Sequence, residues 1–185
     1  MHLEEKTQKS EITYQGKIFH ITKDTALLED GQEVQRDVVH HSGGVCVVPL
    51  TENNTVLMVN QYRYPMHEIT LEIPAGKREQ GENPEECGLR ELREEVGRTC
   101  NSYISLGCTY PTPAYDTEVI YMYLARELSA PKEQQLDDEE FLDIVEIPLE
   151  EAVNLVMQGK IPDAKTQIAL LKTWFLIKKE KDQNI

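Results

Sequence analysis

Three glutamates near the middle of the chain are spaced so that a helix would bring their carboxylates together. Glu94 and Glu95 follow Glu91 by three and four residues, which places all three on one helical face. Like charges at this spacing destabilise a helix in water, whereas hard divalent cations such as Mg²⁺ prefer carboxylate oxygens as ligands. The cluster therefore indicates metal-assisted hydrolysis of a phosphoanhydride. A solvated acidic helix face is the alternative.

The flanking residues predict where this helix begins and ends. Asn83 is a favourable N-cap, Pro84 suits the first helical position, and Gly97 is expected just past the last turn. Gly88 is unfavourable inside a helix by about 1 kcal/mol relative to alanine. We therefore expect a strand to pass close to it. The preceding segment 69–74, ITLEIP, reads as a short strand that leads into a polar loop.

The same residues resemble the signature of the Nudix hydrolases, GX5EX7REUXEEXGU, in which U is a bulky aliphatic residue. The matching positions are Gly76, Glu82, Arg90, Glu91, Leu92, Glu94, Glu95 and Gly97. The chain departs from the signature only at the last position, where it has Arg98, so the packing at the helix end is expected to differ. Gly76 is expected to allow a tight turn over the helix.

The resemblance implies a role for each acid of the motif. Glu91 and Glu95 would be the main ligands of Mg²⁺, with Glu94 assisting and the carbonyl of Ala75 joining them. Mn²⁺ is a possible substitute. Arg90 is expected to orient a glutamate through a charge-assisted hydrogen bond.

Segments outside the motif resemble the ADP-ribose pyrophosphatase branch of the family. They are VNQYRYP, LEIPAGK, the DAKT of residues 163–166, and the loop TPAYDTE at 112–118, which contains Pro113 and has Ala114 where the branch has glycine. Glu72 in LEIPAGK is either an acid near the site or a structural residue. Alanine tolerates positive φ poorly, which makes the turn at residue 114 less favourable.

This resemblance implies substrate contacts at several positions. Arg63 would contact the phosphates or the adenine side, Arg36 would line the same site, and Glu118 would hold the ribose side. Surface salt bridges are the alternative role for each. An acid on a loop would assist the attacking water, with Glu140 favoured and Asp138 next among Asp137, Asp138, Glu139 and Glu140. The products would be AMP and ribose 5-phosphate.

The composition limits the classes of protein to which the chain can belong. With 185 residues, 39% hydrophobic and 28% charged, the chain is long enough for one ordinary globular domain. A net charge of −14 argues against binding to nucleic acid or to an anionic membrane surface. The four cysteines show no CxxC spacing, and no apolar run could form a signal or a membrane span. We expect reduced thiols and a cytoplasmic location.

The order of the predicted elements indicates an α+β fold. Residues 12–41 alternate as an antiparallel meander, with a turn at 29–31, and β-rich runs follow at 45–50 and 55–63. Further β-rich runs come after the acidic helix, and the predicted helices 149–159 and 163–179 close the chain. This order predicts a mixed β-sheet flanked by helices, an α/β/α sandwich of the Nudix fold.

The resemblance also implies a domain organisation and a partner. Residues 1–42 would form an N-terminal β-sheet element for dimerisation, and residues 43–185 the hydrolase domain. We therefore expect a homodimer that acts on a nucleoside diphosphate sugar. Two alternatives are open: hydrolysis of another nucleoside diphosphate derivative, such as GDP-mannose, NADH or a dinucleoside polyphosphate, and a non-catalytic ligand-binding module of the same fold.

Overall fold

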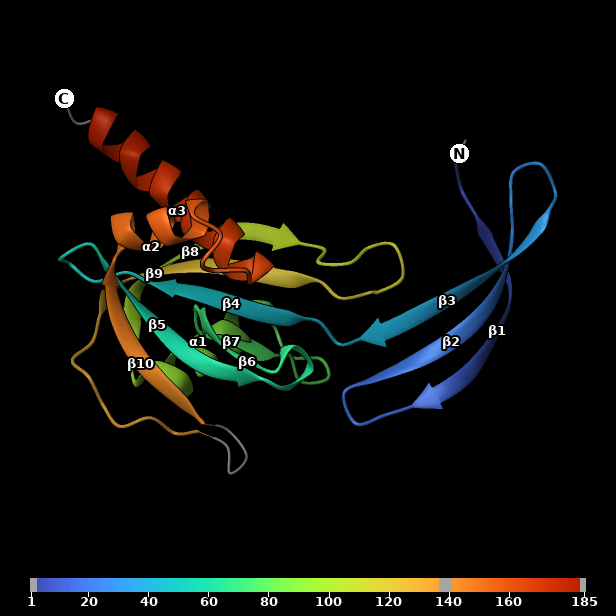
Figure 1. The fold of residues 1–185 in the computed structure, drawn as a ribbon, viewed down its shortest axis with the longest axis horizontal. Coiled ribbons are helices and arrows are strands. Elements are labelled where there is room, and N and C mark those ends of the chain that lie inside the picture. Colours follow the sequence, from blue (N-terminus) through green and yellow to red (C-terminus); the bar gives the residue numbers. More distant parts are fainter. Residues whose placement is uncertain (1–2, 137–140, 184–185) are drawn as a thin grey trace. The chain divides into compact units, whose positions relative to one another are not determined.

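The structure, a computed structural model, describes residues 3–136 and 141–183 and divides into two compact units (Figure 1). The first unit contains the chain up to residue 43 together with residues 110–119. The second contains residues 44–109 and the chain from residue 120 onward. The loop 112–118 therefore belongs to the N-terminal unit, although it lies far from that unit in the sequence.

The first unit is built on a three-stranded antiparallel sheet. Its strands are β1 (Lys6–Gln15), β2 (Phe19–Leu27) and β3 (Glu33–His41), in that order. The predicted turn joins β2 to β3, with Gly31 at φ 86°. Strand β1 begins before the predicted start at Ile12. The sequence does not reveal its first residues as a strand, because they are polar and exposed on both faces and show no alternation.

The segment 110–119 lies along the outer edge of β3. The Val39 N–H donates to the Tyr115 carbonyl at 2.7 Å, and the Thr117 N–H donates to the Val39 carbonyl at 3.0 Å. The hydroxyl of Thr117 accepts from the His41 N–H at 3.1 Å. These bonds pair the free backbone groups of an edge strand with a loop from elsewhere in the chain.

The second unit contains two sheets. One has the order β10 (Leu142–Pro148), β5 (Thr55–Arg63) and β6 (Glu68–Glu72), and the other has β7 (Ala75–Lys77), β4 (Gly44–Pro49), β9 (Ile120–Leu128) and β8 (Cys100–Thr109). Strands β4 and β9 are parallel and their neighbours are antiparallel, as expected for a mixed sheet. A short 3₁₀ turn at Tyr64–Met66 joins β5 to β6.

Strand β7 was not predicted, because the sequence indicates a loop at this position. Its three residues include Gly76 and are too few to show an alternating pattern. They pair with β4, so that Ala75 lies opposite Cys46. Pairing with the buried strand β4 therefore gives this segment β structure, although its own sequence carries no β signal.

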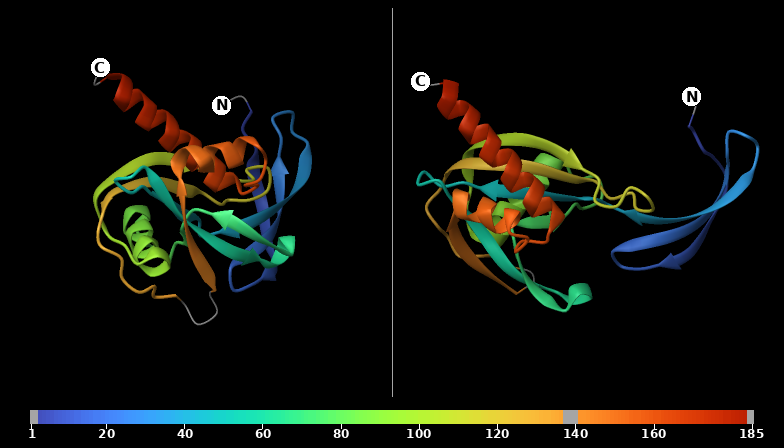
Figure 2. Two further views of the ribbon diagram at one scale, coloured as in Figure 1. Left: turned by 60° about the vertical axis from the view of Figure 1, so that its left-hand side comes forward. Right: turned by 45° about the horizontal axis from the view of Figure 1, so that its top comes forward.

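Alternate side chains of the central strands enter two separate cores. In β4, Cys46 and Val48 pack with α2 (Leu149–Met157) and α3 (Ala164–Gln183), whereas Val45 and Val47 pack with α1 (Pro84–Val96). Figure 2 shows the strands lying between α1 on one side and α2 and α3 on the other. The predicted α/β/α sandwich is confirmed.

Helix α1 has the predicted ends. The Asn83 side chain accepts from the Glu85 N–H at 2.8 Å, and Gly97 follows the last turn with φ 61°. The Arg98 N–H donates to the Leu92 carbonyl at 3.3 Å, and its guanidinium donates to the Ser129 carbonyl. Arg98 therefore holds the helix end through polar contacts, where the family signature has an aliphatic residue.

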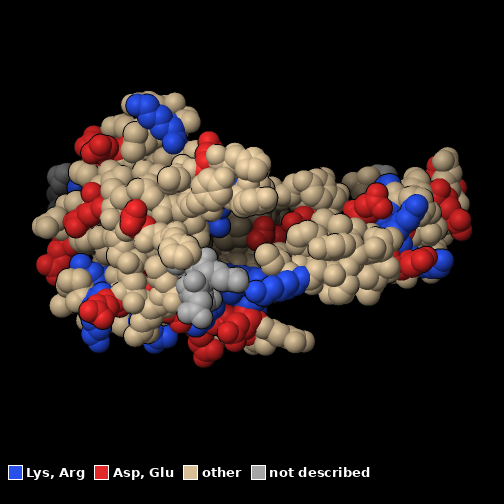
Figure 3. Space-filling view, turned by 60° about the horizontal axis from the view of Figure 1, so that its bottom comes forward, with Lys and Arg blue, Asp and Glu red and all other residues tan. Residues whose placement is uncertain are grey.

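The described surface carries charges of both signs. On the face in Figure 3, acidic and basic side chains are interspersed among uncharged ones. No helix in the described part of the chain is long and apolar enough to cross a membrane.

All four cysteines are free, and burial raises the pKa of the Cys46 thiol to about 12.

Gly88 allows α1 to approach the sheet closely, as expected. A Cβ atom at this position would lie 2.0 Å from the Tyr103 hydroxyl oxygen and 2.8 Å from Val45 Cγ1. The ring of Tyr103 is fixed by stacking on Tyr123, with centroids 4.5 Å apart. Its buried hydroxyl has no hydrogen-bond partner among the described residues.

We predict that Gly88→Ala destabilises the protein by about 1–3 kcal/mol, because the added methyl group would overlap Tyr103 and Val45. This steric cost outweighs the gain of about 1 kcal/mol in helix propensity. The free energy of unfolding in urea measures the effect. Tyr103→Phe removes the unpaired hydroxyl, so we expect Gly88→Ala to cost less in that background. A Gly88→Ala variant as stable as the wild type would contradict the prediction.

Candidate active site

Two of the three clustered glutamates are buried. Glu91 and Glu95 lie one helical turn apart on the inner face of α1, with residue exposures of 7% and 1%. Glu94 is only partly buried. A solvated acidic face is therefore the wrong description of Glu91 and Glu95, since an ionised carboxylate in such a position needs a partner.

Both buried carboxylates lie against the backbone of β7. The Ala75 N–H donates to Glu95 Oε2 at 3.1 Å. A Cβ atom at Gly76 would lie 1.7 Å from Glu91 Oε1, so only glycine leaves room for this carboxylate. Gly76 has no positive φ. It is therefore required for close contact with Glu91, and it lies within strand β7 instead of in the tight turn that the sequence predicted.

Arg90 supplies the positive charge for the acids around it. Its Nε atom lies 2.9 Å from Glu82 Oε1, and its Nη1 atom lies 2.7 Å from Glu91 Oε1 and 2.9 Å from Glu94 Oε2. The hydrogen bond from Arg90 outweighs burial and lowers the pKa of Glu82 to about 2. One guanidinium thus binds three carboxylates that would otherwise repel one another.

The described residues contain no group of three or more His, Cys, Asp or Glu side chains arranged to hold a metal ion. Glu91 and Glu94 are turned towards Arg90, while Glu95 accepts from a backbone N–H. The donor types nevertheless fit a hard divalent cation, because carboxylate oxygens of Glu91 and Glu95 lie beside the peptide groups of residues 75 and 76.

A second charged network surrounds Glu72, which is 2% exposed. Arg63 donates from Nε to Glu72 Oε1 at 2.7 Å and from Nη2 to Oε2 at 2.6 Å. The Thr70 hydroxyl donates to Oε1 at 2.5 Å, and Lys165 Nζ donates to Oε2. Lys165 is also 3.0 Å from Asp163 Oδ1. Four donor atoms from three elements of structure thus meet at one carboxylate.

These donors determine the ionisation of Glu72. Burial alone would raise the pKa of this carboxyl, but Arg63 and Lys165 outweigh burial and hold the pKa at about 2. The hydrogen bond to Glu72 in turn raises the pKa of Arg63. Lys165 was not predicted as a site residue. Its only signal in the sequence is its place in the DAKT segment.

The segment before the predicted loop acids is bound to the end of α1. The Gln134 side chain donates to the Glu95 carbonyl at 2.6 Å, and the Gln135 N–H donates to the Glu94 carbonyl at 2.9 Å. These bonds satisfy carbonyls that a helix end leaves unpaired. The predicted loop acids themselves, Asp137, Asp138, Glu139 and Glu140, lie outside the described residues.

The predicted substrate contacts Arg36, Pro113 and Glu118 lie in the first unit. Arg63 and the acids of α1 lie in the second. Arg36 forms a bidentate pair with Glu5, with N–O distances of 3.0 and 2.9 Å. Glu118 Oε1 lies 3.3 Å from His41 Nδ1. Pro113 is exposed in its turn.

The turn that contains Pro113 forms without strain at Ala114. Four non-glycine residues in the described part of the chain have positive φ, and they are Leu3, Asn54, His67 and Glu127. Ala114 is not one of them. The Tyr115 and Asp116 N–H groups both donate to the Thr112 carbonyl, at 3.3 and 3.1 Å. The expected penalty for alanine in place of glycine therefore does not arise.

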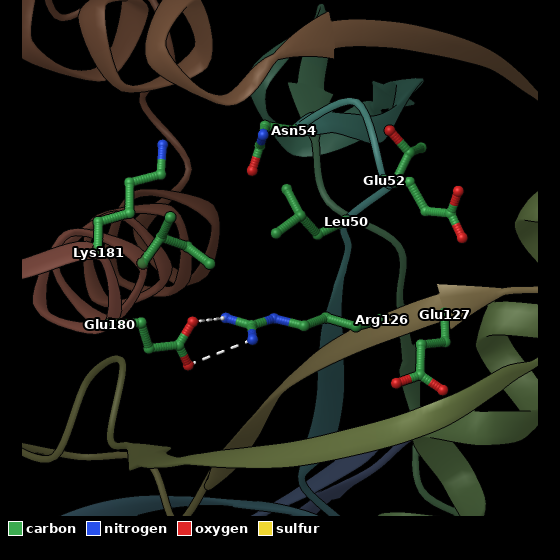
Figure 4. A pocket seen from close by; sticks show the side chains of 9 residues that line it. Leu50, Glu52, Asn54, Arg126, Glu127, Glu180 and Lys181 are labelled. Atoms are coloured by element: carbon green, nitrogen blue, oxygen red, sulfur yellow. Dashed lines mark hydrogen bonds and ion pairs between the residues drawn. The ribbon is translucent and has the colours of Figure 1, made fainter. Parts of the chain in front are cut away.

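A cavity of about 350 Å³ lies elsewhere in the second unit (Figure 4). It is bordered by the turn between β4 and β5, the end of β9 and the last turns of α3. Arg126 reaches across it to Glu180, with a shortest distance of 2.9 Å. None of the predicted site residues lines this cavity, so it does not belong to the acidic site on α1.

Comparisons with known proteins show the family and the fold. The family model described as NUDIX domain matches residues 40–170. An ADP-ribose pyrophosphatase of Bacillus subtilis (strain 168) is 38% identical over 169 residues, which cover 91% of each chain. A methanol dehydrogenase activator of Bacillus methanolicus is 39% identical over 168 residues, covering 90% of this chain and 91% of the relative. The crystal structure of an ADP compounds hydrolase superposes with a TM-score of 0.82 at 21% identity, covering 97% of both chains.

We predict that Glu72→Gln lowers the free energy of unfolding at pH 7 by about 3 kcal/mol, because it leaves the buried Lys165 and the partly exposed Arg63 without their shared counter-charge. The folded pKa of about 2 lies below the ordinary value of 4.5. The stabilisation by the carboxylate is therefore complete above about pH 4.5 and is lost as the pH falls towards 2. Urea unfolding at pH 7, 4 and 3 should show the two proteins converging.

Glu68→Gln is the matched control for this experiment, because it removes an exposed carboxylate from the same strand. We expect a change within about 0.5 kcal/mol at every pH. If Glu72→Gln behaves like this control, the network does not stabilise the fold.

Proposed function

The chain belongs to the Nudix hydrolase family, and from this premise we propose that it hydrolyses the pyrophosphate of ADP-ribose to AMP and ribose 5-phosphate. The observation that carries the proposal is the pair of buried carboxylates, Glu91 and Glu95, held against residues 75 and 76 beside Arg90. Phosphoanhydride hydrolysis requires such a group of acids, because the diphosphate brings negative charge that divalent cations must offset.

Glu91 and Glu95 would hold the divalent cation, which we propose to be Mg²⁺, with Glu94 and the Ala75 carbonyl assisting. Mn²⁺ would substitute, since it prefers the same oxygen ligands. When bound, the cation offsets the charge of the phosphoryl oxygens and supplies an activated water.

Arg90 orients the acids around it. Its three carboxylate partners lie on two segments, the loop that contains Glu82 and the helix itself. A charge-assisted hydrogen bond of this kind fixes the carboxylate plane and favours the charged form. Arg90 therefore prepares oxygens of Glu91 and Glu94 for a cation without touching the substrate.

The reaction also needs a group that accepts a proton from the attacking water. We propose Glu140 for this role, with Asp138 and Glu139 as alternatives. Water oxygen forms a bond to one phosphorus, the bridging P–O bond breaks, and the proton passes to the acid. The preceding residues Gln134 and Gln135 are bonded to α1, which supports a role for this loop near the acids.

Arg63 is the proposed cation for the diphosphate, because its side chain is 38% exposed although it is paired with Glu72. Arg36, Pro113 and Glu118 are proposed as further substrate contacts. Arg36 would exchange Glu5 for an anionic substrate, and Glu118 could accept from ribose hydroxyls beside His41.

We predict that the wild type with Mg²⁺ converts ADP-ribose to AMP and ribose 5-phosphate, and that EDTA abolishes the reaction. Glu95→Gln should lower kcat by on the order of 100-fold or more, because the loss of a metal ligand removes several kcal/mol of transition-state stabilisation. Separation of the products by chromatography measures both effects.

Glu86→Gln is the matched control, because it removes an exposed carboxylate from the first turn of the same helix. We expect its activity to stay within about twofold of the wild type. GDP-mannose, NADH and a dinucleoside polyphosphate serve as competing substrates in the same assay. Turnover of one of these without any AMP from ADP-ribose would overturn the substrate assignment, and no turnover at all would favour a binding module.

We also propose that residues 1–42 form the dimerisation element of a homodimer. The first unit exposes large apolar side chains on its sheet and the adjoining turn, including Ile12, Tyr14 and Ile18 at 59%, 51% and 57%. A three-stranded sheet with this exposure needs a partner surface to cover it.

We predict a sedimentation mass twice the chain mass of 21.2 kDa. Ile12→Glu should shift the protein towards the monomer, because a charge buried in an interface is costly. Lys9→Glu on the same exposed strand controls for the added carboxylate. A monomeric wild type at micromolar concentration would contradict the dimer.

A further inference from the structure

One edge of the Arg63 guanidinium is held by the protein. Its Nε and Nη2 atoms both donate to Glu72, in the parallel arrangement that gives such pairs their fixed geometry. Thr70 holds the same carboxylate from the neighbouring strand, at 2.5 Å. Nη1 is not used in these contacts, and it is the part of the guanidinium left to meet an anion.

Lys165 balances the charge around this pair. Arg63 and Lys165 are two cations, and Glu72 and Asp163 are two carboxylates, with Lys165 in contact with both acids. The charge of Asp163 also acts on Arg63. Without Lys165, Arg63 alone would face Glu72 and Asp163 as well as the charge of Glu95, and less of its positive charge would remain for a phosphate.

The first turn of α3 fixes the position of Lys165. Asp163 Oδ2 accepts from the Thr166 N–H at 2.9 Å, which caps the helix. The buried Thr166 hydroxyl accepts from the Ile73 N–H at 3.1 Å. Glu72 immediately precedes Ile73 in the chain, so this bond holds Lys165 beside Glu72. The lysine side chain is only 10% exposed. Its charge is therefore directed at this network rather than at solvent.

We propose that Lys165 is a positioning residue for the substrate, acting through Glu72 to keep Arg63 oriented towards the diphosphate with its positive charge only partly offset. The proposal rests on the proposed hydrolysis of ADP-ribose. Lys165 itself does not contact the substrate. Its loss should therefore weaken binding of the diphosphate more than it slows the chemical step.

The test compares Lys165→Met with the wild type in two measurements. One is KM and kcat for ADP-ribose with Mg²⁺, and the other is the Kd of ADP by calorimetry. We expect KM and Kd to rise on the order of tenfold, as for the loss of one charge-assisted hydrogen bond, with kcat within about threefold. Lys165→Arg keeps the charge and should recover part of the affinity.

Two further variants separate positioning from stability. Lys179→Met removes an exposed lysine from the same helix and should leave KM and Kd unchanged. In the Arg63→Gln background, Lys165→Met should raise Kd no further, because Lys165 acts through Arg63. If Lys165→Met does not fold, Thr70→Val loosens Glu72 from the neighbouring strand and should raise KM in the same direction.

Three results would contradict the role of Lys165 or the proposed function. A lower melting temperature with unchanged KM and Kd would overturn the proposal and leave Lys165 a structural residue. Effects that multiply in the double variant would also overturn it, because Lys165 would then act independently of Arg63. Failure of the wild type to hydrolyse ADP-ribose would refute the proposed function, while the ADP titration would still decide the role of Lys165.

Discussion

Burial of carboxylates is the constraint on which the rest of this structure depends. An ionised carboxylate away from water is several kcal/mol less favourable unless cations and hydrogen-bond donors surround it. Glu72, Glu91 and Glu95 are all below 10% exposed. Their partners come from different segments: Lys165 from α3, Arg90 from α1, and the Ala75 N–H from β7. The contact of Glu72 therefore fixes α3 against β6, and the contact of Glu95 fixes α1 against β7.

The apolar core provides the frame that makes such pairing possible. Alternate residues of β4, β5 and β9 enter the core beneath α1 or the core beneath α2 and α3, so these strands are buried on both faces. Within this frame Gly76 and Gly88 allow close approach, the first for the Glu91 carboxylate and the second for Tyr103 and Val45. Each glycine is needed for the space it leaves, and neither adopts a left-handed backbone.

The sequence predicted the features that arise from local interactions. The ends of α1 follow from Asn83 and Gly97, and the clustering of its acids follows from helical spacing. The features that were missed depend on distant residues. Strand β7 exists because β4 pairs with it, and Lys165 binds Glu72 across 93 positions of sequence. No pattern within a short window contains such information, and a polar start such as that of β1 shows no alternation at all.

The pairing of the acids with Arg90 also determines how a divalent cation can bind. Arg90 already neutralises Glu91 and Glu94, and the Ala75 N–H already satisfies one oxygen of Glu95. The acids therefore have partners in the fold before any metal arrives, unlike those of small domains that fold only around a metal. A cation at Glu91 must share that carboxylate with Arg90 or displace it. Metal affinity at the proposed site would then be the difference between two favourable arrangements of the same charges, and a cation would bind and leave without unfolding the helix.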